Sequence, residues 1–235
     1  DFQISPQIGS QVVFPGARLS FDNNPDLLAE EIAREFPDQA DNLRRMVADM
    51  ADYNDLTDEH QQLSAREGVS SYLTEPLRVE MLFCPLMVYG SAREHDMDWG
   101  QFCIMFRSIF LEGLGRPHAG VRLILKNLVK KYRALGGELK LRAGVKRIET
   151  EDGADGKRRV VGVELEDGTE LETRRVLSSA GWFETMRMCD DGAPVFESRV
   201  PGKLSFCETI STLDIDPQQL GYDRTITFFN DHDDF

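Results

Sequence analysis

The sequence has 235 residues, and its 41 acidic side chains outnumber the 27 basic ones, which gives a formal net charge of −14. Hydrophobic residues make up 41% and charged residues 29% of the chain, a globular composition that excludes a disordered protein. So acidic a surface repels phosphate backbones, and we therefore expect no nucleic-acid partner. No apolar run approaches the roughly 18 residues that a transmembrane helix needs, so we expect no membrane-spanning segment.

The cysteines follow no pattern typical of disulfides or metal ligands. Cys84, Cys103, Cys189 and Cys207 are widely spaced, without a CxxC pair or a histidine at zinc-like spacing. We expect four free thiols in a reducing, cytoplasmic environment and no metal site. The run at 231–234 contains metal-ligating residue types, but polar residues at a chain end are more typical of a solvated segment.

The N-terminal part of the chain predicts a short strand and then a series of helices. QVVFPG at 11–16 is typical of a strand that ends in a Pro-Gly turn. Asn24 before Pro25 predicts a helix start, and apolar residues recur at four-residue spacing from Leu28 to Phe36. Further helices are predicted for a segment carrying Leu43 to Tyr53, for 64–74 behind a Ser64–Glu67 capping box, for a short piece bounded by Pro76 and Pro85, and for 97–113.

The segment MDWGQFCIMFRSIFLEG at 97–113 gathers aromatic residues, among them Phe102 and Phe106, on one broad helical face. Such a face is more often directed to the protein core than to a ligand. The alternative is that part of it lines an apolar ligand pocket. The Met-rich and aromatic stretch from Leu77 to Phe110 would suit an apolar substrate, although such residues also simply fill cores.

Near residue 138 the sequence changes from mainly helical to mainly strand. An amphipathic helix is predicted from Val121 to Leu135, with Gly136-Gly137 as its end. The elements predicted after it are strands at 139–141 and 145–148, a hairpin in which Asp167-Gly168 joins RVVGVELE to TELET, a strand buried on both faces at 176–181, a helix at 182–188, and strands within 203–215 and 224–231.

The order of these features from Pro117 to Ala180 resembles the flavin-dependent oxidoreductases of the phytoene desaturase type, within the amine oxidase superfamily. The resemblance implies a mixed α/β fold, in which a helical substrate region joins part of a flavin-binding-domain sheet with a hairpin excursion. It divides the chain into a mainly helical substrate-binding region at 1–137, partial FAD-domain strands and hairpin at 138–190, and the start of a substrate-domain sheet at 191–235.

The resemblance also implies where FAD would be bound. In the family the strand with a Val-x-x-Ile stretch, here Val145 to Ile148, lies beside the flavin adenine, so the backbone of Val145 is expected to hydrogen-bond that ring. Ser178, Ser179 and Ala180 end the strand that returns to the flavin, and small side chains there allow the backbone to approach a ligand closely.

A loop from Arg116 to Gly120 corresponds to the family's Pro-x-Gly-Gly loop near the flavin ring and substrate, with Ala119 in place of the first glycine. Gly120 gives the backbone freedom at the helix entry. His118 is either a proton-handling group or a surface histidine. Arg116 either holds an acidic substrate group, or neutralises reduced flavin, or is an ordinary surface arginine. We predict no specific catalytic residue, because the cofactor carries the chemistry of desaturation.

The sequence contains no GxGxxG loop for the pyrophosphate and no distal flavin-binding segment. We therefore expect an internal segment of a longer flavoenzyme that does not bind FAD tightly by itself; the alternative is a diverged, cofactor-free protein. The expected parent reaction is hydride transfer from or to a largely apolar substrate, such as an isoprenoid or carotenoid. The alternatives are an amine oxidase or protoporphyrinogen oxidase-like enzyme, or a non-enzymatic module that binds a lipid or a protein. Peripheral membrane contact is left open.

Overall fold

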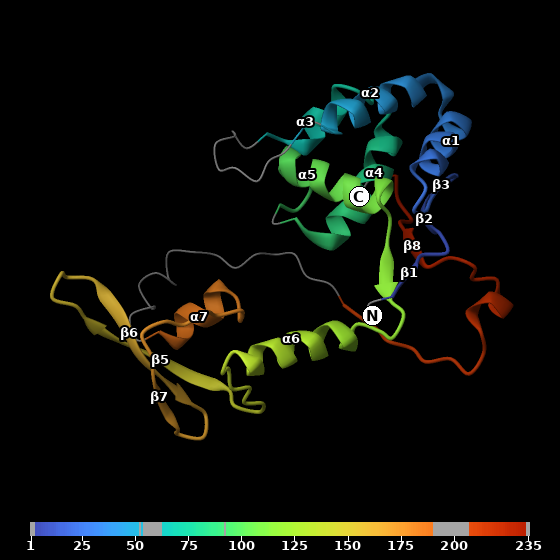
Figure 1. Cartoon of the computed structure of the whole chain (residues 1–235). Helices are drawn as coiled ribbons and strands as arrows, with labels where there is room; N and C mark the ends of the chain where they lie inside the picture. The colour runs from blue at the N-terminus through green and yellow to red at the C-terminus, as the bar shows by residue number, and fades with distance from the viewer. Residues whose placement is uncertain (1–2, 52, 54–62, 92, 190–206, 234–235) are drawn as a thin grey trace. The chain divides into compact units, whose positions relative to one another are not determined.

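A computed structural model of the protein describes residues 3–51, 53, 63–91, 93–189 and 207–233. Helices and three small sheets give a mixed α/β structure, as the sequence predicted (Figure 1). The chain divides into two compact units. Unit 1 consists of Asp1–Leu125 and Leu204–Phe235, and unit 2 is Lys126–Lys203. The functional division predicted from the sequence, with boundaries near 138 and 190, stays a prediction.

The sheet of unit 1 has the strand order β3-β2-β8. Strand β2 (Ser10–Phe14) pairs antiparallel with β3 (Ala17–Phe21) across the predicted Pro-Gly turn, where Gly16 has a φ of 72°. Strand β8 (Ile226–Phe229) pairs in parallel with β2 and brings segments from opposite ends of the chain together. Alternate residues of β2 are buried, so one face of this sheet is directed to the core.

The predicted strand within 203–215 is wrong for its described part. Residues 203–206 lie outside the described ranges, and residues 207–215 contain no strand and are exposed. No neighbouring strand pairs with them in the described part of the chain, and an unpaired segment has no ladder of hydrogen bonds to hold it extended. The strand predicted within 224–231 is confirmed as β8.

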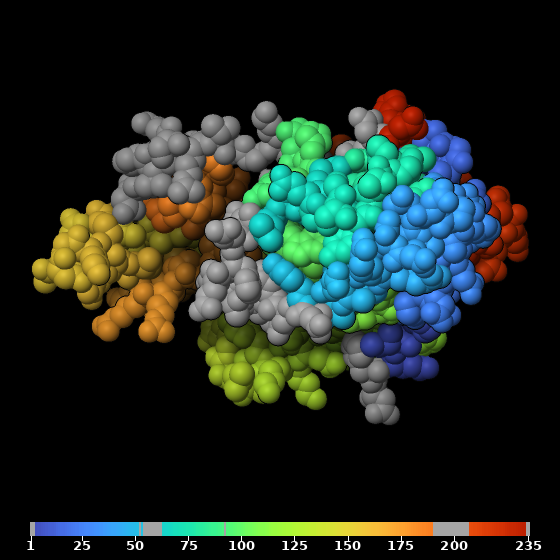
Figure 2. Space-filling model, turned by 90° about the horizontal axis from the view of Figure 1, so that it is seen from above, coloured from blue at the N-terminus to red at the C-terminus, as the bar shows by residue number. Residues whose placement is uncertain are grey.

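Helices α1 to α5 gather beside this sheet, and Figure 2 shows the surface that α1 to α3 form. Their bounds are Pro25–Glu35 for α1, Ala40–Ala51 for α2 after the 3-10 turn Pro37–Gln39, Ala65–Ser70 for α3, Pro76–Gly90 for α4 and Trp99–Phe106 for α5. The predicted caps are confirmed, because the side chain of Asn24 accepts from the Asp26 N–H and that of Ser64 from the Glu67 N–H. Among the described helices, none is both long and apolar enough to cross a membrane.

Helix α4 is longer than the sequence predicted, because Pro85 lies inside it rather than at its end. A proline within a helix removes one backbone hydrogen bond and crowds the preceding turn. Here the residues from Met81 to Leu86 are all buried, and the packing of this apolar stretch stabilises the continued helix.

The core of unit 1 is built around the aromatic face of α5. Phe102 and Phe106 are fully buried, and their rings form a series with Trp99 and Phe110 at centroid distances of 5.0 to 5.7 Å. The last turn widens into a π-helix at Arg107–Leu111, in which Phe110 is buried against Phe21 of β3. The aromatic face of this helix is therefore directed to the core, as one of the two interpretations of the sequence predicted.

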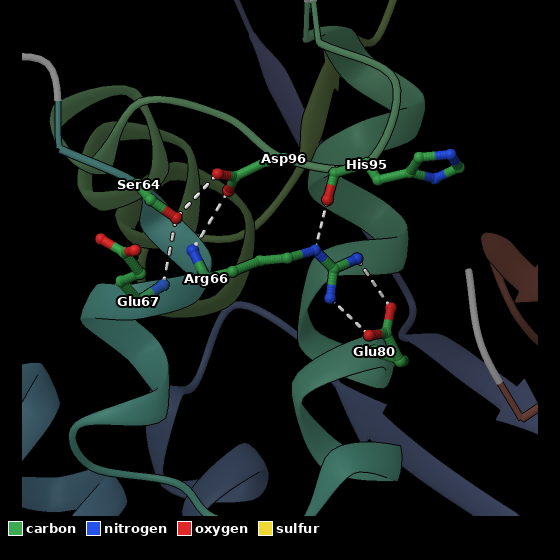
Figure 3. A network of polar contacts seen from close by, with 6 residues as sticks. All are labelled: Ser64, Arg66, Glu67, Glu80, His95 and Asp96. Carbon is green, nitrogen blue, oxygen red and sulfur yellow. Dashed lines mark hydrogen bonds and ion pairs between the residues drawn. The ribbon is translucent and has the colours of Figure 1, made fainter.

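A polar network joins α3, α4 and the loop before α5 (Figure 3). The guanidinium of Arg66 forms a bidentate pair with the carboxylate of Glu80 and donates from Nε to the carbonyl of His95. Asp96 accepts from the Ser64 hydroxyl at 2.7 Å and from the Arg66 N–H at 3.1 Å. The carboxylates thus satisfy donors at the start of α3 and fix it to its two neighbours.

Unit 2 is a three-stranded antiparallel sheet with two helices. Its elements are α6 (Arg122–Ala134), whose first turn belongs to unit 1, β5 (Val145–Asp152), β6 (Arg158–Leu165), β7 (Glu170–Glu172) and α7 (Trp182–Met188). The hairpin with the Asp167-Gly168 turn is confirmed, with Gly168 at a φ of 81°. The predicted end of α6 is confirmed too, because Gly136 has a φ of 85°.

Helix α6 keeps its apolar stripe on the surface. Leu125 and Leu128 are 56% and 61% exposed, and no residue of α6 is buried. The sequence pattern therefore predicts the helix and its amphipathic character, but not the burial of its apolar stripe.

Two predicted strands of unit 2 are wrong. Residues 139–141 form no strand, and Leu141 is 76% exposed. Residues 176–180 are irregular, and Leu177 is fully exposed where the sequence predicted burial on both faces. In both places the apolar pattern is present, but no described strand pairs with it. A strand forms only beside a partner, and local sequence does not supply one.

Candidate functional site

A two-stranded ribbon in unit 1 positions the predicted substrate loop. Strand β1 (Ile4–Pro6) pairs antiparallel with β4 (Gly115–Pro117), so Ser5 lies opposite Arg116. A Cβ atom on Gly115 would lie 2.8 Å from the side chain of Ile4, so only glycine allows the two strands to approach this closely. The ribbon fixes the backbone of Arg116 while its side chain remains exposed.

The loop after β4 is held by one backbone hydrogen bond to the N-terminal segment and by another within the loop. The His118 N–H donates to the carbonyl of Gln3 at 2.9 Å, and Nδ1 of His118 lies 3.1 Å from the Ser5 hydroxyl oxygen. Gly120 has a φ of 83°, and its N–H donates to the carbonyl of Pro117 at 2.8 Å. The structure thus places Arg116 on β4 and His118 and Gly120 in the turn that follows it, with the His118 ring fixed on its Nδ1 side.

A cleft of about 810 Å³ lies beside this ribbon, entirely within unit 1. Its walls come from the end of β1, the end of α4, the start of β4, the segment 216–225 and the first residue of β8. Its lining residues are Ser5, Pro6, Gln7, Ile8, Tyr89, Leu114, Gly115, Arg116, Asp216, Pro217, Gln218, Tyr222, Asp223, Arg224, Thr225 and Ile226. Arg116 is the predicted site residue that reaches it.

Phe102 and Phe106 lie in the core rather than at this cleft. Neither residue is among those that line this cleft. The aromatic series does continue from Phe110 through Phe21 and Phe228 to Tyr89, which lines the cleft. A role of Phe102 and Phe106 as ligand contacts stays a prediction, and the structure gives them a supporting place behind the cleft wall.

The predicted cofactor residues lie in unit 2 and are only partly brought together. Val145 begins β5 opposite Leu165. Ser178 and Ser179 line a second cavity of about 560 Å³, together with Ile148, Val160, Val176, Gly181, Trp182, Thr185, Met186 and Cys189. Val145 and Ala180 are not among the lining residues. The two serines therefore share a site with the isoleucine of the Val-x-x-Ile stretch rather than with its valine.

Local hydrogen bonds shape the wall of this second cavity. The Thr185 hydroxyl lies 2.7 Å from Oγ of Ser178, which also accepts from the Ala180 N–H at 3.3 Å. Gly181, with a φ of 95°, turns the chain into α7. No charged side chain is among the described residues that line the cavity. Its chemistry therefore suits a flat, uncharged ring better than an anion.

A sequence model of the flavin containing amine oxidoreductases matches residues 9–181. The chain belongs to this family. The match extends from the residue before β2 in unit 1 to the residue before α7 in unit 2, so it includes residues of both candidate sites. No curated protein matches the sequence.

Membership of the flavin containing amine oxidoreductases implies a flavin cofactor. The residues of unit 2 fit one end of FAD: the second cavity has apolar walls and small polar groups for an adenine ring. They do not fit the pyrophosphate, because the lining described above includes no arginine or lysine and the sequence holds no GxGxxG loop. Within the described residues, no group of three or more potential ligands could hold a metal ion.

Sequence reasoning missed most of the cleft in unit 1. The pattern predicts a helix end at Pro85, which leaves Tyr89 outside the helix whose last turn in fact positions it. Gln7 and Arg224 come from opposite ends of the chain and meet because β8 pairs with β2. The alternating pattern of RTITFFND gave a signal for the strand, but a local pattern does not name the partner of a strand.

Proposed function

We propose that the complete protein is a flavin-dependent oxidoreductase of the desaturase or dehydrogenase type, similar to phytoene desaturases, and that it acts on a largely apolar substrate. The observation that carries this proposal is the cleft in unit 1, where Ile8, Leu114 and Ile226 line a space next to the loop that resembles the flavin-facing loop of that group. Apolar side chains of this kind are favourable contacts for an apolar body.

Bound flavin would supply the two-electron chemistry. In a desaturation a hydrogen leaves one carbon as a hydride with both electrons of its C–H bond, and oxidised flavin would be the acceptor. A proton leaves the neighbouring carbon to water, and the electron pair of that second C–H bond forms the C=C bond. The chain would contribute binding and orientation. The β1–β4 ribbon fixes Arg116 at the cleft and His118 in the turn that follows β4. In unit 2 we propose that Ser178 and Ser179 contact the adenine. We also propose a cytoplasmic protein that meets apolar substrate at a membrane surface.

The family description favours oxidation of an amine as the second candidate. The two can be separated by anaerobic mixing of the purified complete protein with phytoene in detergent or with benzylamine. We expect phytoene, and not benzylamine, to bleach the visible absorption of the bound flavin. Bleaching by the amine alone would replace our proposal with amine oxidation. A protein that binds no flavin would leave only the binding-module alternative.

A further inference from the structure

The lining of the cleft in unit 1 combines apolar side chains with charged and amide groups. Ile8 and Tyr89 are 71% and 52% exposed, and Leu114 and Ile226 line the same space. The ring of Tyr89 is fixed against Phe228, with its centroid 6.1 Å away in an edge-to-face arrangement. A ligand with an apolar body would therefore find a wall that is already in place.

Four charged side chains line the cleft, and three of them have partners. Asp216 accepts a hydrogen bond from the Gln218 N–H at 3.0 Å, as the cap of a short 3-10 turn. Asp223 lies 3.4 Å from Nε of Arg224. The guanidinium of Arg116 has no hydrogen bond or ion pair within the described chain. The lining holds two arginines and two aspartates, so its formal charges balance, and the guanidinium of Arg116 is the charged group left without a partner in the described chain.

The absence of a side chain at Gly9 leaves room for the second arginine of the cleft, Arg224. Gly9 is buried with a φ of 153°, and a Cβ atom there would lie 3.0 Å from Nη1 of Arg224. The carbonyl of Gly9 also accepts from the Thr225 N–H at 2.7 Å, and the Thr225 hydroxyl accepts from the Ile8 N–H at 3.0 Å. The backbone thus joins these two walls of the cleft and leaves room for the Arg224 guanidinium.

A further donor at the cleft has no acceptor. The side-chain carbonyl oxygen of Gln7 accepts a hydrogen bond from the Ser10 hydroxyl at 2.6 Å, and this bond fixes the orientation of the Gln7 amide group. Its Nε2 atom is buried and has no hydrogen-bond partner among the described residues. Buried donors without an acceptor are rare and costly, and an oxygen atom of a ligand would satisfy this one.

We propose that this cleft binds an amphipathic monocarboxylate: an apolar chain or ring with one carboxylate that pairs with Arg116, close to Arg224 and the amide of Gln7. A guanidinium matches the two oxygens of a carboxylate in a bidentate pair. The guanidinium of Arg116 is the one charged group of this lining without a partner in the described chain, so it can pair with one negative charge on a ligand. The net charge of −14 disfavours a ligand with several negative charges. This binding is argued from the lining of the cleft alone and does not rest on the proposed function.

The test is calorimetric titration of the complete protein, with its flavin content read from the visible spectrum of the same sample. The probes are octanoate, its neutral analogue octanamide, acetate and octyl phosphate. We expect octanoate to bind best, acetate not to bind measurably, and octanamide to bind about tenfold more weakly than octanoate, the loss expected for one charge-assisted pair. Arg116→Gln should weaken octanoate about tenfold and leave octanamide unchanged, and Arg116→Lys should lose less.

Arg18→Gln is the matched control, because Arg18 is an exposed arginine on β3, outside the cleft, and the change in charge is the same. Equal binding of octanoate and octanamide, an equal loss in Arg18→Gln, or tighter binding of octyl phosphate would overturn the carboxylate assignment. Absence of octanoate binding to a flavin-loaded protein would overturn this inference alone. Arg116-dependent binding to a flavin-free protein would overturn the proposed function and leave the inference intact. A melting temperature equal to that of the unchanged protein shows that each variant is folded.

Discussion

Glu31 is a buried carboxylate that joins α1 to β3. Only 6% of the residue is exposed, and its Oε2 accepts from the Ser20 N–H at 3.0 Å while Oε1 pairs with Arg34. Burial by itself would raise the pKa of Glu31, but the hydrogen bonds from Arg34 and Ser20 outweigh it and hold the pKa below the ordinary value of 4.5. The ionised form is therefore the one that the fold stabilises.

The lowered pKa of Glu31 determines how its contribution to stability depends on pH. Because the folded pKa lies below the unfolded one, the contribution of Glu31 is fully present above the ordinary pKa and is lost as the pH falls through the lowered value. Glu31→Gln should destabilise the protein by about 1–2 kcal/mol near neutral pH, and the difference should shrink in acid. Urea unfolding of the unchanged protein and of Glu31→Gln at several pH values measures this difference in the free energy of unfolding. A difference that is independent of pH would show that the charge does not matter.

Arg78 and Cys84 are buried on α4, where burial disfavours the charged form of both side chains. Arg78 lies 3.9 Å above the ring of Phe36 and 3.4 Å from Glu75, yet its Nε and Nη1 have no hydrogen-bond partner among the described residues. Burial lowers the pKa of Arg78, and burial together with Glu80 raises the pKa of Cys84 to about 12. The Cys84 thiol is therefore protonated and unreactive at neutral pH.

At the scale of helices and strands, the features that could be predicted from the sequence are those that depend on neighbouring residues. The caps at Asn24 and Ser64, the Asp167-Gly168 turn and the end of α6 at Gly136 depend on residues within a few positions, and the structure confirms them. Strands β1 and β2 pair with β4 and β8, which lie more than 100 residues away, and short strands do not encode such pairings. The cleft depends on those pairings, so the sequence predicted Arg116 but not its surroundings.

Helices α5 and α6 illustrate that an apolar stripe does not by itself mean burial. Phe106 on α5 is fully buried, while Leu128 on α6 is 61% exposed. Phe106→Ala should destabilise this 235-residue chain by about 3–5 kcal/mol, because it leaves a cavity. Leu128→Ala should change its stability by no more than about 0.5 kcal/mol, because it removes no packed contact. Denaturant unfolding of the two variants provides the comparison, and equal losses would mean that α6 is packed.

At the scale of the whole molecule, the family match runs through both units, while the flavin contacts that we propose account for only part of the cofactor. Unit 1 contributes the cleft and the loop that carries Arg116 and His118, and unit 2 contributes the cavity with Ser178 and Ser179. Neither contains the glycine-rich helix start that holds a pyrophosphate in dinucleotide-binding folds. The central claim is that these parts serve a flavoenzyme.

The most direct test of that claim is the ratio of FAD to protein after purification, measured for the protein encoded by the complete reading frame and for this 235-residue chain alone. We predict about one FAD per chain in the complete protein and none retained by the shorter chain, because the phosphates need an anion-binding loop that this sequence lacks. A complete protein that purifies without flavin and does not take it up on addition would contradict the account.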